Sequence, residues 1–175
     1  MLLAGCCLVA VAGCERTTPE QYFAKAVLGS NLLYGFAGPA MQSQLASPSA
    51  KLTDAKTGAT APMKRAEVLE AKLDAVQNSF ETVKALKRND DTKEMIAASL
   101  ALYEFVLPVY RNEYQELAAL YDSGAAPEKI AALEKTIAEK YSSQFQSLRS
   151  ALIAAGKSYA ARHNIKVQEV NPSPR

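Results

Sequence analysis

Apolar side chains recur alternately four and three residues apart over residues 91–122 of this 175-residue chain. This spacing places them on one face of an α-helix, where they can pack against a neighbouring helix. Similar runs extend over about 63–88 and about 127–163. The first run contains Ile96, Leu100, Tyr103, Leu107, Tyr110, Tyr114, Leu117 and Tyr121. The pattern predicts an all-α protein with three long helices.

The connections between these helices are short, so the helices should run antiparallel to one another. Pro108 lies inside the middle helix and predicts a kink, because proline removes one backbone hydrogen bond and clashes with the preceding turn. Thr18, Pro19 and Gln21 form a helix-start pattern. The residues over about 22–37 that follow are apolar nearly all round, which is typical of a buried helix. We therefore predict an elongated antiparallel bundle of three long helices plus a shorter apolar N-terminal helix.

Two segments lack helical patterning. Residues 46–62 are mostly small and polar and contain three helix breakers, so they are predicted to form a flexible loop or a crossover along the bundle. Residues 164–175 alternate only weakly and end in a Pro-rich stretch, which predicts a loosely ordered tail. The helical bundle is therefore expected over residues 19–163.

Side chains that could carry catalysis or hold a metal are scarce. His163 is the single histidine, and we expect it to be solvated at a helix end. A Glu-x-x-His pair is absent, because Ala160 stands three residues before it. All cysteines lie within the first 14 residues, and the formal net charge of +2 is too small to indicate a nucleic-acid partner. We predict no catalytic residues, no metal, no cofactor and no enzymatic activity.

Four tyrosines share one face of the predicted middle helix: Tyr103, Tyr110, Tyr114 and Tyr121. Their rings can pack as core, but their hydroxyl groups need hydrogen-bond partners. Two interpretations are open. The tyrosines form a seam of the bundle, or they line an amphipathic groove for a peptide or lipid that the kink at Pro108 opens.

The N-terminal region contains a short apolar run that ends in a cysteine and is followed by polar residues. The run reads Leu8-Val9-Ala10-Val11-Ala12-Gly13-Cys14, with Glu15-Arg16 after it. It resembles the lipobox of bacterial lipoproteins, over residues 8–14 only, and no family is recognised in the rest of the chain. The resemblance implies that residues 1–13 are a signal peptide and that a peptidase cuts before Cys14.

The same resemblance implies a lipid anchor. Cys14 would carry the lipid, and residues 14–18 would form a short tether to the bundle. Glu15 stands where lipoproteins kept in the inner membrane often have Asp, which favours the outer membrane, with the protein facing the periplasm. No basic residue precedes Arg16, as one normally would in a secretory signal, which favours a translation start upstream of Met1.

Together these features predict a membrane-anchored envelope lipoprotein. Its expected partners are the lipid bilayer, through the acylated cysteine, and an envelope protein. We expect a non-enzymatic interaction module that serves as adaptor, assembly factor or inhibitor. The alternative is a carrier or chaperone that binds an apolar ligand or peptide in the tyrosine-lined groove.

Overall fold

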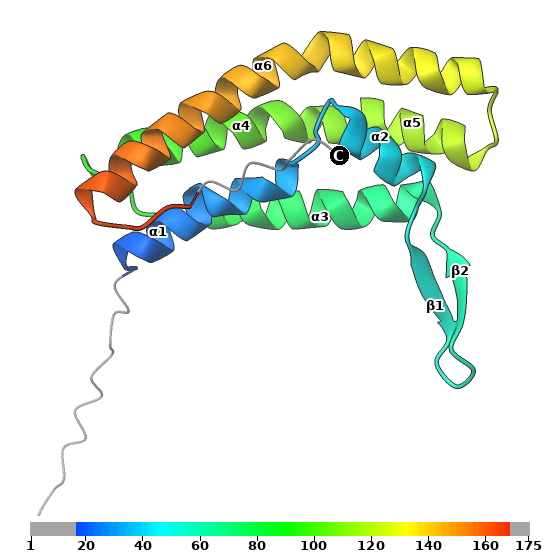
Figure 1. Cartoon of the computed structure of the whole chain (residues 1–175), viewed down its shortest axis with the longest axis horizontal. Coiled ribbons are helices and arrows are strands. Elements are labelled where there is room, and N and C mark those ends of the chain that lie inside the picture. The colour runs from blue at the N-terminus through cyan, green and yellow to red at the C-terminus, as the bar shows by residue number, and fades with distance from the viewer. Residues whose placement is uncertain (1–16, 169–175) are drawn as a thin grey trace, which may run out of the picture.

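The computed structural model describes residues 17–168, which are mostly helical with one small two-stranded sheet (Figure 1). The predicted signal peptide, Cys14 and the first part of the tether lie outside the described residues, as does the end of the predicted tail. The elements are α1 (Pro19–Ala26), the 3-10 helix η1 (Leu28–Leu33), α2 (Pro39–Ala46), β1 (Ala50–Asp54), β2 (Ala59–Pro62), α3 (Arg65–Lys84), α4 (Lys93–Arg111), α5 (Glu113–Asp122) and α6 (Pro127–Arg162).

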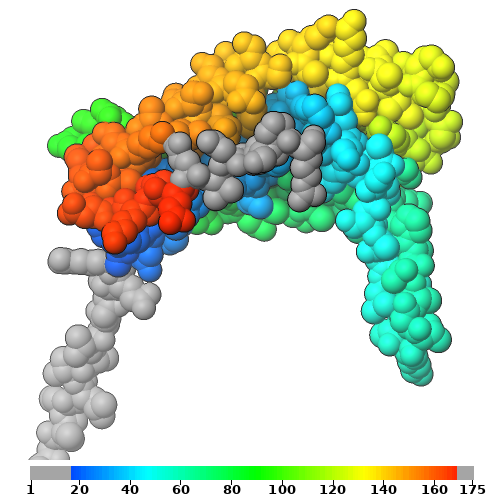
Figure 2. All heavy atoms as spheres, in the orientation of Figure 1, coloured from blue at the N-terminus to red at the C-terminus, as the bar shows by residue number. Residues whose placement is uncertain are grey.

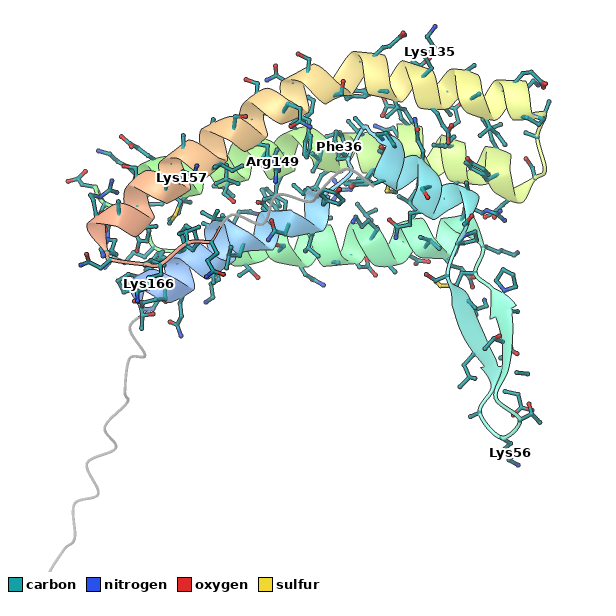
Figure 3. All side chains as sticks on the ribbon, in the orientation of Figure 1. Phe36, Lys56, Lys135, Arg149, Lys157 and Lys166 are labelled. Carbon is teal, nitrogen blue, oxygen red and sulfur yellow. The ribbon has the colours of Figure 1, made fainter. Side chains whose placement is uncertain are left out.

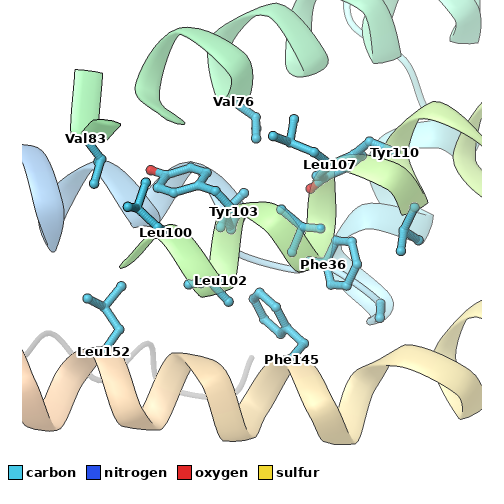
Figure 4. Close-up of a cluster of buried hydrophobic side chains, with 14 of the residues drawn as sticks. Phe36, Val76, Val83, Leu100, Leu102, Tyr103, Leu107, Tyr110, Phe145 and Leu152 are labelled. Carbon is cyan, nitrogen blue, oxygen red and sulfur yellow. The ribbon is translucent and has the colours of Figure 1, made fainter. Parts of the chain in front are cut away.

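The helices lie side by side along one long axis (Figure 1). The segment α1–η1–α2 and the segment α4–α5 run in one direction, while α3 and α6 run in the other. Helix α4 packs against both α3 and α6, and the core fills the space between them (Figure 4). Val76 of α3, Leu102 of α4 and Leu152 of α6 are fully buried in this core. In the described part of the chain, no helix is long and apolar enough to cross a bilayer.

The predicted helix over 91–122 is not continuous. The chain divides at Asn112 into α4 and α5, and not at Pro108, which lies exposed inside α4. The carbonyl that Pro108 leaves without an amide partner belongs to Glu104, which is also exposed, so water can satisfy it. Asn is a weak helix former, which is consistent with a break at position 112, although its side chain forms no capping hydrogen bond with α5.

The predicted helix over about 22–37 is also interrupted. The capping box is confirmed, since the side chains of Thr18 and Gln21 each accept from the other's backbone N–H. However, α1 ends at Ala26, and Gly-Ser-Asn in the following turn favours the short helix η1 over a longer α-helix. Gly35 then takes a left-handed conformation with φ 82°, and Pro39 starts α2.

The segment 46–62 is not a structureless loop. It contains the hairpin β1–β2, in which Lys51 pairs with Ala61 and Leu52 with Thr60. The turn forms because the Asp54 carboxylate accepts from two backbone N–H groups, of Lys56 at 2.7 Å and Thr57 at 3.3 Å. Helices α2 and α3 meet at the same end of the protein, so the segment is not a crossover either (Figure 1).

Three elements are joined at the base of the hairpin. Asp122, the last residue of α5, accepts from the backbone N–H groups of Arg65 and Ala66 at 2.8 and 3.0 Å, and so caps the start of α3 from another helix. The Arg65 side chain donates to the carbonyl of Leu45 in α2 at 3.1 Å. The polar end groups of three helices therefore satisfy one another.

Helix α6 ends as predicted near His163, but the residues that follow are tied back to it. Asn164 takes a left-handed conformation with φ 54°. Its backbone N–H donates to Ala161, and that of Ile165 donates to Ala160 at 2.9 Å. These two bonds form a Schellman cap, which places Ile165 against the core. The first residues of the predicted loose tail are therefore docked.

Candidate functional site

The structure places most of the tyrosine face in the protein core. Tyr103, Tyr110 and Tyr114 are at most 1% exposed, and Tyr121 is half-buried. Phe36, from the turn before α2, covers this face: its ring centroid lies 5.4 Å from that of Tyr110 and 5.9 Å from that of Tyr114. Pro108 faces away from them and is exposed. Among the described residues, this face therefore packs as core and does not form a groove.

The hydroxyl groups of this face join segments that are distant in sequence. The Tyr103 hydroxyl lies 2.6 Å from Ser79 Oγ of α3, and the Tyr114 hydroxyl accepts from the backbone N–H of Ala37 at 2.9 Å. The Tyr121 hydroxyl donates to Glu134 at 2.8 Å. The Tyr110 hydroxyl is buried and has no hydrogen-bond partner among the described residues.

Burial keeps these hydroxyl groups protonated. It raises the pKa of Tyr114 to about 12 and raises that of Tyr110 further. Burial, and after it the hydrogen bond to Glu134, raises the pKa of Tyr121 to about 12. The neutral Tyr114 hydroxyl holds Ala37 of the N-terminal segment against α5, while those of Tyr103 and Tyr121 bind α3 and α6, and none of them is prepared to act as a base.

A groove of about 870 Å³ lies elsewhere, between the N-terminal segment and α6. Its apolar wall includes Phe23 of α1, Val27 directly after α1, and Phe145 and Ile153 of α6. Figure 3 shows Phe36, Arg149 and Lys157 along this side of the helical body. The remaining lining residues are Leu28, Asn31, Tyr34, Gly35, Ala37, Gly38, Pro39, Ala40, Ser142, Gln146, Val167 and Gln168.

The rim of this groove exposes large apolar side chains. Tyr34 is 60% exposed and Leu28 is 49% exposed, and both line the groove, while Leu32 beside them is 39% exposed. The prediction that this N-terminal helix is buried on all sides is therefore wrong. Its apolar residues divide between the core, which receives Phe23, and an open surface, a pattern that marks binding sites more often than neutral surface.

The charges in the groove have one sign. Arg149 and Lys157 of α6 line it, and no Asp or Glu does so among the described residues. Arg149 is half-buried and forms no hydrogen bond or ion pair with another residue in 17–168. A guanidinium group held at an apolar wall attracts an anionic group with two acceptor oxygens.

His163 is not a solvated side chain, contrary to expectation. It is half-buried, and its Nε2 lies 2.6 Å from Asp91 Oδ2. Arg162 donates to Asp91 Oδ1 and to the Asp91 backbone carbonyl, both at 3.0 Å. The hydrogen bond with His163, and then that with Arg162, lowers the pKa of Asp91. This cluster joins the end of α6 to the loop before α4 and includes no nucleophile.

Within the described residues, no three His, Cys, Asp or Glu side chains gather in a way that could hold a metal ion. The groove residues named above had a partial signal in the sequence. Gly35 disfavours an α-helix and Pro39 cannot continue one, so these two lining residues mark where the N-terminal helical run breaks, and a break of this kind exposes helix ends and nearby side chains. Arg149 carried no signal, because a cation on a long polar helix is ordinarily solvated.

Known proteins offer no comparison for these features: no family model matches the chain, and no curated protein or solved structure matches it significantly.

Proposed function

We propose that this protein is an envelope lipoprotein that binds a partner protein without catalysing a reaction. In this proposal the acylated Cys14 anchors it in the outer membrane, facing the periplasm, and the helices form an elongated antiparallel bundle. The observation that supports the proposal is the hairpin β1–β2, which projects from the helical body as an arm (Figure 2).

The arm has the properties of a hairpin to whose edge a strand of a partner protein can be added. Every residue of β1 is exposed, and Leu52 is 60% exposed. In the described part of the chain, each strand pairs only with the other, so both outer edges carry unpaired backbone groups. A two-stranded hairpin is marginally stable alone in water. A strand of a partner protein added at one edge would satisfy these groups and cover Leu52.

The arm is also held in a fixed direction at its base. Lys51 of β1 forms an ion pair with Glu67 in the first turn of α3. The backbone N–H of Met63 donates to the Ser49 carbonyl at 2.9 Å and closes the hairpin at the body. A partner that meets the arm therefore meets it in a defined orientation relative to the helices.

Site-specific photo-crosslinking tests this proposal. A photoreactive amino acid replaces Leu52 in the full, lipidated chain expressed in its native host, and the matched control carries it at Lys135, an exposed position on α6 (Figure 3). We expect one adduct of defined mass from position 52 and none from position 135. Adducts of equal yield from both positions would show that the arm has no dedicated partner.

A deletion variant separates the arm from the body. A short Gly-Ser connection replaces residues 50–62, which the adjacent ends Ser49 and Met63 permit. The variant should keep the helical circular dichroism spectrum of the wild type, because the strands contribute little to the core, and should lose the partner. Undiminished partner recovery with this variant would contradict a role for the arm.

A second candidate function is transport or chaperoning of an apolar ligand. The groove between η1 and α6 supports it, since a volume of about 870 Å³ lies within the usual range of small-molecule sites, roughly 300–1,000 Å³. The site differs from the tyrosine face from which this function was first expected. Binding of a neutral apolar probe by the chain, with loss of binding when Ile153 is replaced by Asp, would support it.

A further inference from the structure

We propose that the groove between η1 and α6 binds a long-chain carboxylic acid of the fatty-acid class, with the acyl chain on the apolar wall and the carboxylate on Arg149. This inference rests on the second candidate function and adds the chemical class of the ligand. It is independent of the hairpin, because no hairpin residue lines the groove. The hairpin follows the far end of α2 (Figure 1).

The wall of the groove suits an acyl chain. Phe23, Val27, Phe145 and Ile153 line it, Phe23 and Phe145 as part of the core, and Leu28 and Tyr34 extend the apolar surface to the rim. A ligand that lies along these side chains meets mainly hydrocarbon, with Asn31, Ser142 and Gln146 as polar groups beside it. Each methylene group that leaves water for such a wall should raise the affinity by up to about fourfold.

The charge on Arg149 selects an anionic ligand over a neutral one. Arg149 is half-buried and has no hydrogen-bond or ion-pair partner in residues 17–168. No carboxylate of the described chain lines the groove. A ligand carboxylate can accept two parallel hydrogen bonds from the guanidinium, whereas an ester or a hydrocarbon leaves the cation without an anion.

The lining residues of the groove come from two regions of the chain, with α6 between them. The turn 34–40 contributes lining residues on one side, and Val167 and Gln168, which follow the Schellman cap of α6, contribute others. Between them the lining residues of α6 run from Ser142 to Lys157, along which Arg149 holds a central position. A ligand with a single anionic group fits the one cation of the groove that has no partner among the described residues, Arg149, better than a multiply charged ligand does.

Fluorescence titration with cis-parinaric acid, an 18-carbon fluorescent fatty acid, and its methyl ester tests the inference. The full chain carries Cys14→Ser, so that no attached lipid competes. We expect saturable binding of the acid and about tenfold weaker binding of the ester. The variant Arg149→Gln should bind acid and ester alike, while the control Arg88→Gln, at an exposed position outside the groove, should keep the preference.

A chain-length series on the unsubstituted groove needs no variant and guards against misfolding of Arg149→Gln. Saturated fatty acids that displace the probe should gain at least about twofold in affinity with each added methylene, and a flat series would overturn the inference. Equal affinity for acid and ester would overturn it as well but leave a carrier of neutral ligands standing. Binding of neither probe would overturn both.

One competing occupant belongs to the chain itself. Residues 169–175 follow Gln168, which lines the groove, and begin with the acidic residue Glu169. A chain shortened to end at Gln168 tests this occupant. If the acid binds only to the shortened chain, the groove serves the protein's own C-terminal segment and the inference is wrong; unchanged affinity in the shortened chain supports it.

Discussion

Two neighbouring tyrosines differ by one hydrogen bond, which makes them a matched pair for a stability experiment. The rings of Tyr110 and Tyr114 are stacked, with centroids 5.2 Å apart, and both side chains are almost completely buried. The Tyr114 hydroxyl accepts from the backbone N–H of Ala37, whereas that of Tyr110 has no partner in residues 17–168. Replacing either tyrosine with Phe removes one hydroxyl group, and the two hydroxyl groups lie in nearly the same environment.

The two replacements should change stability in opposite directions. Tyr114→Phe leaves the Ala37 N–H buried without an acceptor, which costs about 1–3 kcal/mol. Ala37 also has φ 50°, an unfavourable conformation for a residue with a side chain, so a weaker hold on this turn can only add to the loss. Tyr110→Phe removes a buried polar group that gains no hydrogen bond, so it should stabilise the protein by about 0–2 kcal/mol.

Urea unfolding followed by circular dichroism measures both effects, since the chain has no Trp for a fluorescence assay. In a chain of this length, 1 kcal/mol corresponds to a change of about 2–4 °C in Tm, so thermal melting gives a second reading. The m-values should stay equal to that of the wild type. Equal destabilisation by Tyr110→Phe and Tyr114→Phe would refute the assignment of their hydroxyl groups.

Three further predictions follow from contacts and from the proposed anchor. Hydrogen bonds hold the pKa of Asp91 below its usual value, so the stability this carboxylate contributes is complete above about pH 4 and is lost as the pH falls toward the lowered pKa. Asp91→Asn should flatten this acid limb in a series of thermal melts, and an unchanged limb would exclude the Asp91 cluster as its source. Gly156→Ala should destabilise the protein by about 1–3 kcal/mol, because the added Cβ would lie 2.8 Å from a methyl group of Val27, which outweighs the higher helix propensity of Ala. Greater stability on urea unfolding would show that Val27 and α6 are not in close contact. Cys14→Ser should abolish lipid attachment and move the protein from the outer-membrane fraction to the soluble periplasm, as measured by intact mass and cell fractionation, and membrane retention without lipid would contradict the proposed anchor.

The strongly periodic parts of the fold were predictable from the sequence. Every apolar residue at the four-and-three spacing from Ile96 to Leu117 is buried. A repeat of this length places all of these residues on one helix face, which is the face that packs into the core. The start of α1 was also predictable from Thr18, Pro19 and Gln21, since a helix cap depends on residues adjacent in sequence.

Features set by distant contacts were not predictable. Asp91 and His163 are in contact although they lie 72 residues apart in sequence, and no local sequence pattern predicts such a contact. The apolar residues Leu28, Leu32 and Tyr34 follow no clear period, so the sequence could not separate the buried from the exposed ones. The hairpin strands are short and poor in β-branched residues, and only Asp54 and Gly58 indicated the turn between them.

The site was predictable only in part. The tyrosines were candidates for a groove because hydroxyl groups on an apolar face need hydrogen-bond partners. The structure instead packs Phe36 over Tyr110 and gives the Tyr114 hydroxyl a partner in the Ala37 N–H. The groove depends on where η1 departs from α-helical geometry and on how α6 passes beside it. Both are properties of packing between segments more than a hundred residues apart, which a single sequence does not express.

The capping of α3 by Asp122 has a consequence for local opening of the protein. The amide hydrogens of Arg65 and Ala66, which a free helix would exchange rapidly, are held by the end of α5. Their hydrogen exchange should therefore be as slow as that of residues deep inside α3, and both helix ends should open in one event. Exchange should become fast only on the hairpin side of Lys64, so that residue marks the boundary between the part of the protein that opens as one unit and the arm.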